Sequence, residues 1–383
     1  MRASYQVADV LNQEAADFHK ICTNSWQERT LHALRKCRTA ALGGHIDVCD
    51  CCEKLHISYN SCRNRHCPTC QGHKQAAWTK KRMEELLPVG YFHVVFTLPS
   101  ELNALSLQHP RIVYASLFKA AWATLQSFSE DPKHLGAKMG MLSILHTWGQ
   151  NMSLHPHLHC IVPGGGITKQ GNWKQAKNKG KFLFPVKAMS KVFRAKYVAQ
   201  LRQHLPGIPQ SLYDQLFSKN WVVYAKPPFS KPANVVEYLG RYTHKIAISN
   251  HRIKEVNKAT KEVTFSYKDY KQGAKNKQLT LSNAEFIRRF SQHILPKGFT
   301  RIRHYGILSS GWKKDKIPNL QLQLGGEYYL KDLLKEEGKT HLKRCFSCKK
   351  GTLRTVVLFD KRGPPKNWKT SAKRIVKSLN QHL

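Results

Sequence analysis

The sequence predicts an α+β protein, because hydrophobic patterns of both helix and strand occur along one chain. Residues 27–42 carry apolar side chains at close to helical spacing, which indicates an amphipathic helix. Residues 91–102, YFHVVFTLPSEL, are rich in β-branched and aromatic side chains, and Pro99 and Ser100 close the run. Such a run is typical of a strand that ends in a turn.

Two further elements and the changes in composition predict three regions. Residues 153–166, SLHPHLHCIVPGGG, alternate like a strand, and residues 233–249, ANVVEYLGRYTHKIAIS, have the spacing of a helix. We expect a helical, cysteine-rich module over 1–80, a central domain over 85–310, and a basic C-terminal region over 311–383.

The charge of the chain excludes several classes of protein. The 383 residues include 63 Lys and Arg against 24 Asp and Glu, for a formal charge of +39. Because these cations are spread along the chain, a nucleic acid is a better partner for them than a membrane surface. The sequence contains no run of about 20 apolar residues that would span a membrane, and its first residues lack the apolar core of a signal peptide. We therefore expect a cytoplasmic protein without a membrane partner.

The cysteines cluster in a way that predicts a metal site. Six of the eleven fall within residues 49–70, and in a reducing compartment metal ligation is favoured over disulfides. Two C-x-x-C pairs within that stretch have the spacing of zinc knuckles, which complete a closed, structural Zn²⁺ site with four thiolates. The expected ligands are Cys49, Cys52, Cys67 and Cys70.

Other cysteines and histidines leave alternatives open. A surplus side chain near the knuckles could replace one of the four ligands, or several could form a second site; the simpler alternative for each is a buried thiol or a surface imidazole. The surplus residues are Cys51, Cys62, His45, His56 and His66. Near the other end of the chain, Cys345 and Cys348 form half a knuckle that needs partners. His341, Cys22 and Cys37 are candidates for that role.

Three histidines predict a second metal site, of a different kind. His155, His157 and His159 alternate along the predicted strand and so share one face, while Leu158 and Cys160 point into the core. Two or three imidazoles leave coordination positions open for substrate oxygens, which suits Mg²⁺ or Mn²⁺ acting on a phosphate, although Zn²⁺ also accepts such ligands. The alternative is a histidine-rich surface strand.

A pair of tyrosines on the predicted helix supplies a candidate nucleophile. Tyr238 and Tyr242 are four residues apart and therefore lie on the same helix face. For an isolated pair of this kind, two amphipathic core residues would be the ordinary interpretation. Beside a metal that polarises a phosphodiester, a phenol can instead form a covalent phosphotyrosine.

Together these motifs resemble the HUH single-strand endonucleases, where U is a hydrophobic residue. The chain is most similar to the two-tyrosine transposases of rolling-circle insertion sequences, the insertion sequence ninety-one type. Three segments carry the resemblance, in the family's order, and a cysteine cluster similar to the family's N-terminal zinc-binding module precedes them. The segments are Phe96-Thr97-Leu98-Pro99, His157-Leu158-His159 and Tyr238-Leu239-Gly240-Arg241-Tyr242.

The resemblance implies a fold and a set of metal ligands. The fold is a five-stranded antiparallel sheet with the HUH motif on a central strand and the tyrosine helix packed beneath it, and Pro156 is expected at that strand's start. His157 and His159 would bind Mg²⁺ or Mn²⁺ with a third polar ligand, for which Gln150 is the first candidate. His155 and Glu237 are the next candidates.

The resemblance also implies an activity. One tyrosine attacks single-stranded DNA at a transposon end or at the target, leaving a 5′-phosphotyrosine and a free 3′-OH, so that rejoining needs no ATP. Arg241 and Lys245 flank the tyrosines and are candidates to neutralise phosphates, with a solvated helix face as the equal alternative. Such a protein would be prokaryotic and nucleoid-associated.

A basic stretch after the histidines suits single-stranded DNA. Residues 161–200 contain nine Lys and Arg and no acid. Aromatic residues are interleaved with these cations, as expected where bases stack and phosphates are neutralised. Whether each aromatic faces DNA or the core stays open at this point. The aromatics are Trp173, Phe182, Phe184, Phe193 and Tyr197.

Two other functions remain as alternatives. A rolling-circle replication initiator or relaxase shares the HUH chemistry, but the cysteine module and the YLGRYTHKIAIS context favour the transposase. A zinc-dependent DNA-binding regulator without catalysis would tolerate loss of the histidines or tyrosines, and here all of them are present.

Overall fold

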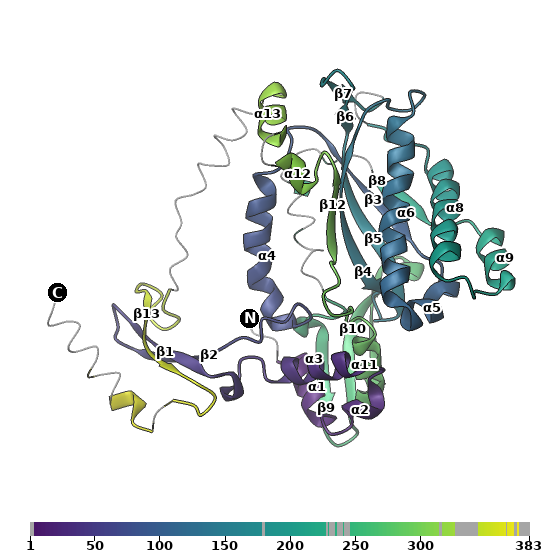
Figure 1. Ribbon diagram of the computed structural model, residues 1–383. Helices are drawn as coiled ribbons and strands as arrows, with labels where there is room; N and C mark the ends of the chain where they lie inside the picture. The colour runs from purple at the N-terminus through teal and green to yellow at the C-terminus, as the bar shows by residue number, and fades with distance from the viewer. Residues whose placement is uncertain are drawn as a thin grey trace.

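A five-stranded antiparallel sheet forms the centre of the molecule (Figure 1). The computed structural model describes residues 4–177, 181–226, 229, 234–235, 240, 246–313, 316–325, 344–364, 366–370 and 374, with the backbone alone at 72–77, 80–81 and 271. The strand order is β12-β4-β5-β3-β8, and each neighbouring pair is antiparallel. The strands are β3 (Tyr91–Thr97), β4 (Gly140–Trp148), β5 (Leu154–Pro163), β8 (Val223–Lys226) and β12 (Ile302–Gly306).

This sheet confirms the α+β fold class and the expected place of the histidines. The two strands predicted from hydrophobic patterns form β3 and β5, and β5, which carries His157 and His159, is the middle strand of the five. Pro156 is the third residue of β5, where the register with β4 shifts between His146 and Trp148. A register shift tolerates a residue without an N–H donor.

One face of the sheet is covered by long helices that form the main core. Leu158, Cys160 and Val162 of β5 point to this face and are fully buried. They pack in one hydrophobic cluster with side chains such as Phe118 and Phe193. The helices on this side are α5 (Asn103–Gln108), α6 (Pro110–Glu130), α8 (Val186–His204) and α9 (Gln210–Ser218). In Figure 1 they lie together on the same side of the strands.

The opposite face, which carries the histidines, is covered only in part. Leu142, Ile144 and Ile161 on this face pack in a second cluster with Val235 and Ile317. Helices that cover this half are α4 (Pro68–Met83), α12 (Ser310–Lys313) and α13 (Lys316–Gln323). A two-stranded ribbon of β6 (Gly165–Ile167) and β7 (Trp173–Gln175) extends beyond β5.

The N-terminal helices pack on a separate three-stranded sheet. Val10 and Leu11 share a buried cluster with Phe265, Phe286 and other apolar residues of that sheet and its helix. The N-terminal helices are α1 (Val7–Gln13), α2 (Phe18–Ile21) and α3 (Ser25–Arg35), and the helix that follows the sheet is α11 (Asn283–Ser291). The strands are β9 (Ile253–Asn257), β10 (Glu262–Asp269) and β11 (Lys275–Ser282), in the order β11-β10-β9.

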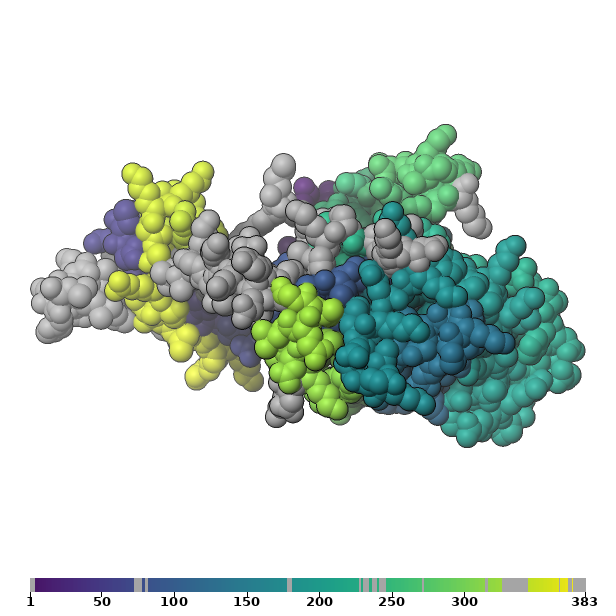
Figure 2. All heavy atoms as spheres, turned by 90° about the horizontal axis from the view of Figure 1, so that it is seen from above, coloured from purple at the N-terminus to yellow at the C-terminus, as the bar shows by residue number. Residues whose placement is uncertain are grey.

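A third sheet joins segments from both halves of the chain. Its order is β13-β1-β2, with strands β1 (Gly44–Cys49), β2 (Leu55–Tyr59) and β13 (Leu353–Phe359). β1 pairs with β13 from Gly44↔Phe359 to Cys49↔Leu353. Both views place this sheet at one end of the molecule, away from α8 and α9 (Figures 1 and 2). Part of the region 311–383, which the sequence set apart, therefore lies beside residues of the region 1–80.

Among the described residues, no helix combines the length and the hydrophobicity that crossing a bilayer requires.

A glycine at the end of β12 gives a test of the central sheet. Gly306 has φ +56°, and an added Cβ would lie 2.0 Å from the carbonyl oxygen of Met139. We expect Gly306→Ala to lower the free energy of unfolding by about 2 kcal/mol or more, since backbone strain adds to a backbone clash. Gly298→Ala is the matched control, because Gly298 has φ +76° and no atom within 4 Å of an added Cβ. Gly298→Ala should lower the free energy of unfolding by only about 1 kcal/mol. Equal losses in denaturant titrations would contradict the clash at Gly306.

Candidate functional site

Three histidines meet on the partly open face of the central sheet. His157 and His159 lie on β5, and His146 lies directly opposite His157 on the neighbouring strand β4. Residues paired in this way point to the same face of a sheet. The ring nitrogens that the three side chains offer lie within 4.8 Å of one another.

The hydrogen bonds around these rings aim their nitrogens at a common point. Nδ1 of His157 lies 2.7 Å from the carbonyl oxygen of His155 and must donate to it, because a carbonyl oxygen only accepts. The neutral ring therefore keeps a lone pair on Nε2. That Nε2 lies 3.2 Å from Nε2 of His159, whose Nδ1 is held 2.8 Å from Nε2 of His93 on β3. A cation between the two Nε2 atoms would stabilise this approach.

Burial keeps the imidazole of His157, and that of His93 behind His159, in the uncharged form. Loss of hydration lowers the pKa of His157 to about 4, and it does the same for His93, where the charge of Lys226 adds to the effect. At neutral pH both rings are uncharged, and only an uncharged imidazole can ligate a metal.

Packing behind the cluster fixes the ring of His146. His146 is 3% exposed, and its ring stacks on Trp148 with centroids 4.6 Å apart. The guanidinium of Arg301 lies 5.0 Å from the centre of the Trp148 ring, and its Nε donates to the carbonyl oxygen of Leu145. Since Arg301 holds both the tryptophan and the backbone of β4, the third imidazole is held from two sides.

The structure brings His146, and not Gln150, to the histidine pair. Gln150 lies in the turn after β4, where it is exposed and its carbonyl oxygen accepts a hydrogen bond from Arg252. His155 is exposed at the start of β5 and is not among the three grouped imidazoles. The sequence holds no local signal for His146, and only the pairing of β4 with β5, which the short segment 149–153 joins, places it opposite His157.

The tyrosine motif lies outside the described residues. The residues that the structure does not describe include Tyr238, Tyr242, Arg241, Lys245 and Glu237. Close by in the sequence, Asn234, Val235 and Gly240 are described and helical, and Val235 is buried against the histidine-bearing face of the sheet.

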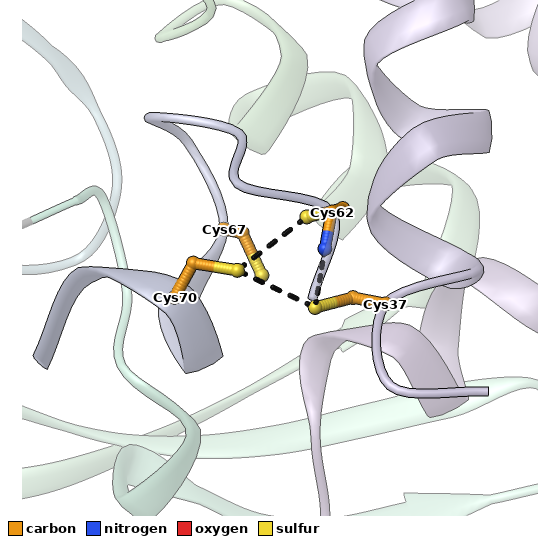
Figure 3. A group of neighbouring side chains, drawn as sticks. All are labelled: Cys37, Cys62, Cys67 and Cys70. Carbon is orange, nitrogen blue, oxygen red and sulfur yellow. Dashed lines mark hydrogen bonds between the residues drawn. The ribbon is translucent and has the colours of Figure 1, made fainter. Parts of the chain in front are cut away.

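The cysteines form two clusters, and the expected grouping of four into one site is wrong. The predicted ligands divide between the clusters, because each C-x-x-C pair meets partners from elsewhere in the chain. The first cluster comprises Cys37, Cys62, Cys67 and Cys70 (Figure 3). The second comprises Cys49, Cys52, Cys345 and Cys348. Each C-x-x-C pair stays within one cluster, but its spacing could not tell which other cysteines it meets.

The first cluster lies where α3, the loop after β2 and α4 meet. Cys37 follows α3, Cys62 lies in the loop, Cys67 directly precedes α4 and Cys70 lies in its first turn, with all four side chains turned inward (Figure 3). Sγ of Cys70 lies 3.5 Å from Sγ of Cys37 and 3.6 Å from Sγ of Cys62. The cluster packs within the apolar core that α1, α3 and α11 share.

Most of the aromatic residues in the basic stretch belong to the core. Phe184, Phe193 and Tyr197 are at most 3% exposed within the main cluster, Trp173 is half-buried, and Phe182 is 42% exposed. The core interpretation therefore holds for the first three, and only Phe182 among the five is available to a ligand on the surface.

Comparisons with known proteins show the family of the chain. A family profile described as "Putative transposase" matches residues 140–316, and one described as "Transposase zinc-binding domain" matches residues 10–98. A protein of Sinorhizobium fredii named "Putative transposase y4qJ" is 40% identical to this chain over 97% of the chain and 100% of that protein. The chain belongs to the insertion sequence ninety-one family of transposases.

A second relative supports the same assignment for this transposase. The transposase for insertion sequence element IS801 of Pseudomonas savastanoi pv. phaseolicola is 29% identical over 73% of this chain and 70% of that protein. No solved structure matches the chain. The first profile spans the histidine cluster and the tyrosines, whereas the zinc-binding profile covers the first cysteine cluster and only half of the second. The transposase thus acts on DNA and contains a zinc-binding domain.

A buried histidine behind the cluster predicts how the stability of the transposase changes with pH. Nε2 of His293 donates to the carbonyl oxygen of Met152 at 3.1 Å, and its Nδ1 lies 3.1 Å from Oγ1 of Thr147. Burial lowers the pKa of His293 to about 4. The unfolded chain protonates this histidine near pH 6.5, whereas the folded chain does so only near pH 4. The neutral histidine therefore makes its full contribution to the free energy of unfolding above pH 6.5, and that contribution is lost as pH falls toward 4.

We expect His293→Gln to flatten that dependence. Between pH 6.5 and 4.5 the wild-type chain should lose about 2–3 kcal/mol more of its free energy of unfolding than the variant. Denaturant titrations over this range measure the difference, with His204→Gln, an exposed position at the end of α8, as the matched control. Parallel profiles for the wild type and His293→Gln would show that His293 is not buried as a neutral group.

Proposed function

We propose that this transposase cuts and rejoins single-stranded DNA through a phosphotyrosine on Tyr238 or Tyr242. The observation that carries the proposal is the convergence of three imidazoles, from His146, His157 and His159, on one face of the central sheet. Val235, three residues before the first tyrosine, is buried on that same face, which supports a tyrosine close to the histidines.

The three imidazoles fit a divalent cation, and they favour one of the two expected ions. Among the described residues, the set contains nitrogen donors and no carboxylate. Mg²⁺ strongly prefers oxygen ligands, whereas Mn²⁺ accepts imidazole nitrogen as well as oxygen. We therefore infer that Mn²⁺ fits these residues better than Mg²⁺. When bound, such an ion withdraws charge from a scissile phosphate and leaves positions open for its oxygens.

The residues of the chain supply the remaining chemistry. The phenol oxygen of one tyrosine gives up its proton and attacks phosphorus in line. The bond from phosphorus to the 3′ oxygen breaks, and that oxygen takes up a proton to become the 3′-OH, so one proton is released and one is taken up. The 5′-phosphate stays esterified to tyrosine, so the energy of the phosphodiester is kept for rejoining. Two tyrosines allow two strands to be held in one cycle, and Arg241 and Lys245 are placed in sequence to neutralise their phosphates.

An exposed aromatic residue and a cation beside the histidines suit a single strand. Tyr224 on the edge strand β8 pairs with Val95, which pairs in turn with His159, so all three side chains share one face. Two strand spacings put Tyr224 about 10 Å from His159. Tyr224 is 53% exposed, and Lys226 on the same face is exposed as well. Base stacking on Tyr224 and phosphate contact by Lys226 would guide a strand toward the histidines.

We also propose that the first cysteine cluster binds the structural zinc ion of the zinc-binding domain. A tetrahedral site with Zn–S bonds of about 2.3 Å separates its sulfur atoms by about 3.8 Å, close to the 3.5 and 3.6 Å separations from Cys70. Without a cation, negative charges on neighbouring sulfur atoms repel one another, and Cys37 and Cys62 accordingly raise the pKa of the Cys67 thiol. An ion here would tie α3 to α4.

Covalent capture tests the nucleophile. Single-stranded oligonucleotides tiled across the DNA that flanks the gene, labelled at their 3′ ends, would be incubated with the full chain and Mn²⁺. We expect a labelled adduct that survives denaturing electrophoresis with at least one oligonucleotide, and its loss in the Tyr238→Phe/Tyr242→Phe double variant. An adduct that persists in the double variant, or none with any oligonucleotide, would contradict the mechanism; an adduct that forms only with duplexes would contradict the single-strand substrate.

The third ligand is tested by two variants four residues apart. His146→Ala should lower the initial rate of adduct formation about 100-fold or more. The variant removes one of the three protein ligands of an ion that stabilises the transition state by several kcal/mol. Gln150→Ala is the matched control and should stay within about twofold of the wild type, since its position in the turn is exposed. A large loss in Gln150→Ala with none in His146→Ala would reverse the assignment.

A further inference from the structure

The C-terminal C-x-x-C pair meets an N-terminal one at the end of the molecule. Sγ of Cys49 lies 3.6 Å from Sγ of Cys348, and Sγ of Cys52 lies 3.7 Å from Sγ of Cys345. The partners are 299 and 293 residues apart in the sequence, and the four sulfur atoms all lie within 4.8 Å of one another. Neither family match reaches the C-terminal pair.

The sulfur separations suit a shared metal ion. They agree with the separation of about 3.8 Å between two thiolates on one tetrahedral zinc ion, whereas the sulfur atoms of a disulfide lie about 2.05 Å apart. Four thiolates fill a tetrahedral zinc site completely, so an ion held here would be structural.

The backbone at both pairs has the form of a zinc knuckle. The N–H groups of Cys51 and Cys52 each point to Sγ of Cys49 at 3.4 Å. At the other pair, the N–H groups of Ser347 and Gly351 point at 3.4 Å to Sγ of Cys345 and Cys348 respectively. Such donors stabilise negative charge on sulfur, which a thiolate ligand carries and a neutral thiol does not.

One further detail repeats at the two pairs, and a second concerns the C-terminal pair. Glu53 directly follows Cys52 with φ +54°, and Lys349 directly follows Cys348 with φ +60°, so each knuckle ends in a left-handed residue. Gly351 approaches the cluster so closely that an added Cβ would lie 2.5 Å from Sγ of Cys49. The same turn, built twice from segments about 300 residues apart, indicates one shared ligand.

Groups around the cluster complete the site and join the two ends of the chain. Nε2 of His56 lies 3.4 Å from Sγ of Cys345, so an N–H on this nitrogen would donate to the thiolate. Asp50 accepts hydrogen bonds from the N–H and the hydroxyl of Thr352, and Asp47 accepts one from the hydroxyl of Thr355 at 2.7 Å. These contacts run alongside the pairing of β1 with β13.

We propose that Cys49, Cys52, Cys345 and Cys348 bind a second structural zinc ion, separate from that of the first cluster. This ion closes a small zinc ribbon of β13, β1 and β2 and makes the C-terminal segment part of the N-terminal zinc-binding module. The site is independent of the histidines and tyrosines, so its presence or absence does not bear on the proposed strand cleavage.

Alkylation of the native, zinc-loaded full chain tests the site residue by residue. Cys51 and Cys52 are neighbours and both are exposed, but only Cys52 belongs to the cluster. With iodoacetamide and peptide mass spectrometry, we expect Cys51 to be modified at once. Cys52, Cys345 and Cys348 should react at least ten times more slowly until a chelator is added. Modification of these three at the rate of Cys51 would overturn the proposal.

Zinc content gives a second, independent measurement. We expect two zinc ions per wild-type chain by elemental analysis, one in Cys348→Ser, one in Cys67→Ser, and two in the matched control Cys51→Ser. One ion per wild-type chain, or two in Cys348→Ser, would overturn the second site. Because the alkylation pattern and the wild-type zinc content need no variant, a poorly folding Cys348→Ser chain leaves the test intact.

Discussion

The antiparallel pairing of β5 with β4 on one side and β3 on the other is the interaction on which the site depends. Because side chains alternate along a strand, this register places His157 and His159 beside His146 on one face and sends Leu158 and Cys160 into the main core. A shift of one residue would move the imidazoles into an apolar interior and the apolar side chains toward solvent. The packing of α6 and α8 on the far face therefore also fixes where the imidazoles point.

The second cysteine cluster lies beside a part of the chain that has little apolar core of its own. The β13-β1-β2 sheet buries few large side chains, among them Ile46 and Val48. A module of this size does not bury enough apolar surface to be stable alone, and small domains compensate with metal ions or disulfides. The proposed second zinc ion meets that need, while the first cluster anchors α3 and α4 to a larger core.

The strands that build the site were predictable because their signals are local. The run at 91–97 and the alternation at 154–163 each identified a strand, and the histidine spacing identified a shared face. His146 was missed because a single histidine in an apolar strand carries no local signal; only its pairing with His157 makes it a candidate ligand. Gln150 was chosen by its closeness in sequence, yet it lies in the exposed turn beyond that pairing.

By itself, the sequence determined the fold class, the polyanionic partner, the strand that carries the histidines and the family resemblance, since each follows from composition or from spacing within one segment. Only the tertiary structure decided which cysteines lie together in a cluster and which histidine joins the pair. The physical reason is that the free-energy cost of closing a loop rises only slowly with the length of the loop. Closing a loop from Cys52 to Cys345, 293 residues on, costs only about 2.6 kcal/mol more than closing one to Cys67. Strand pairing such as that of β1 with β13 can outweigh such a difference, so nearness in sequence does not select the partner.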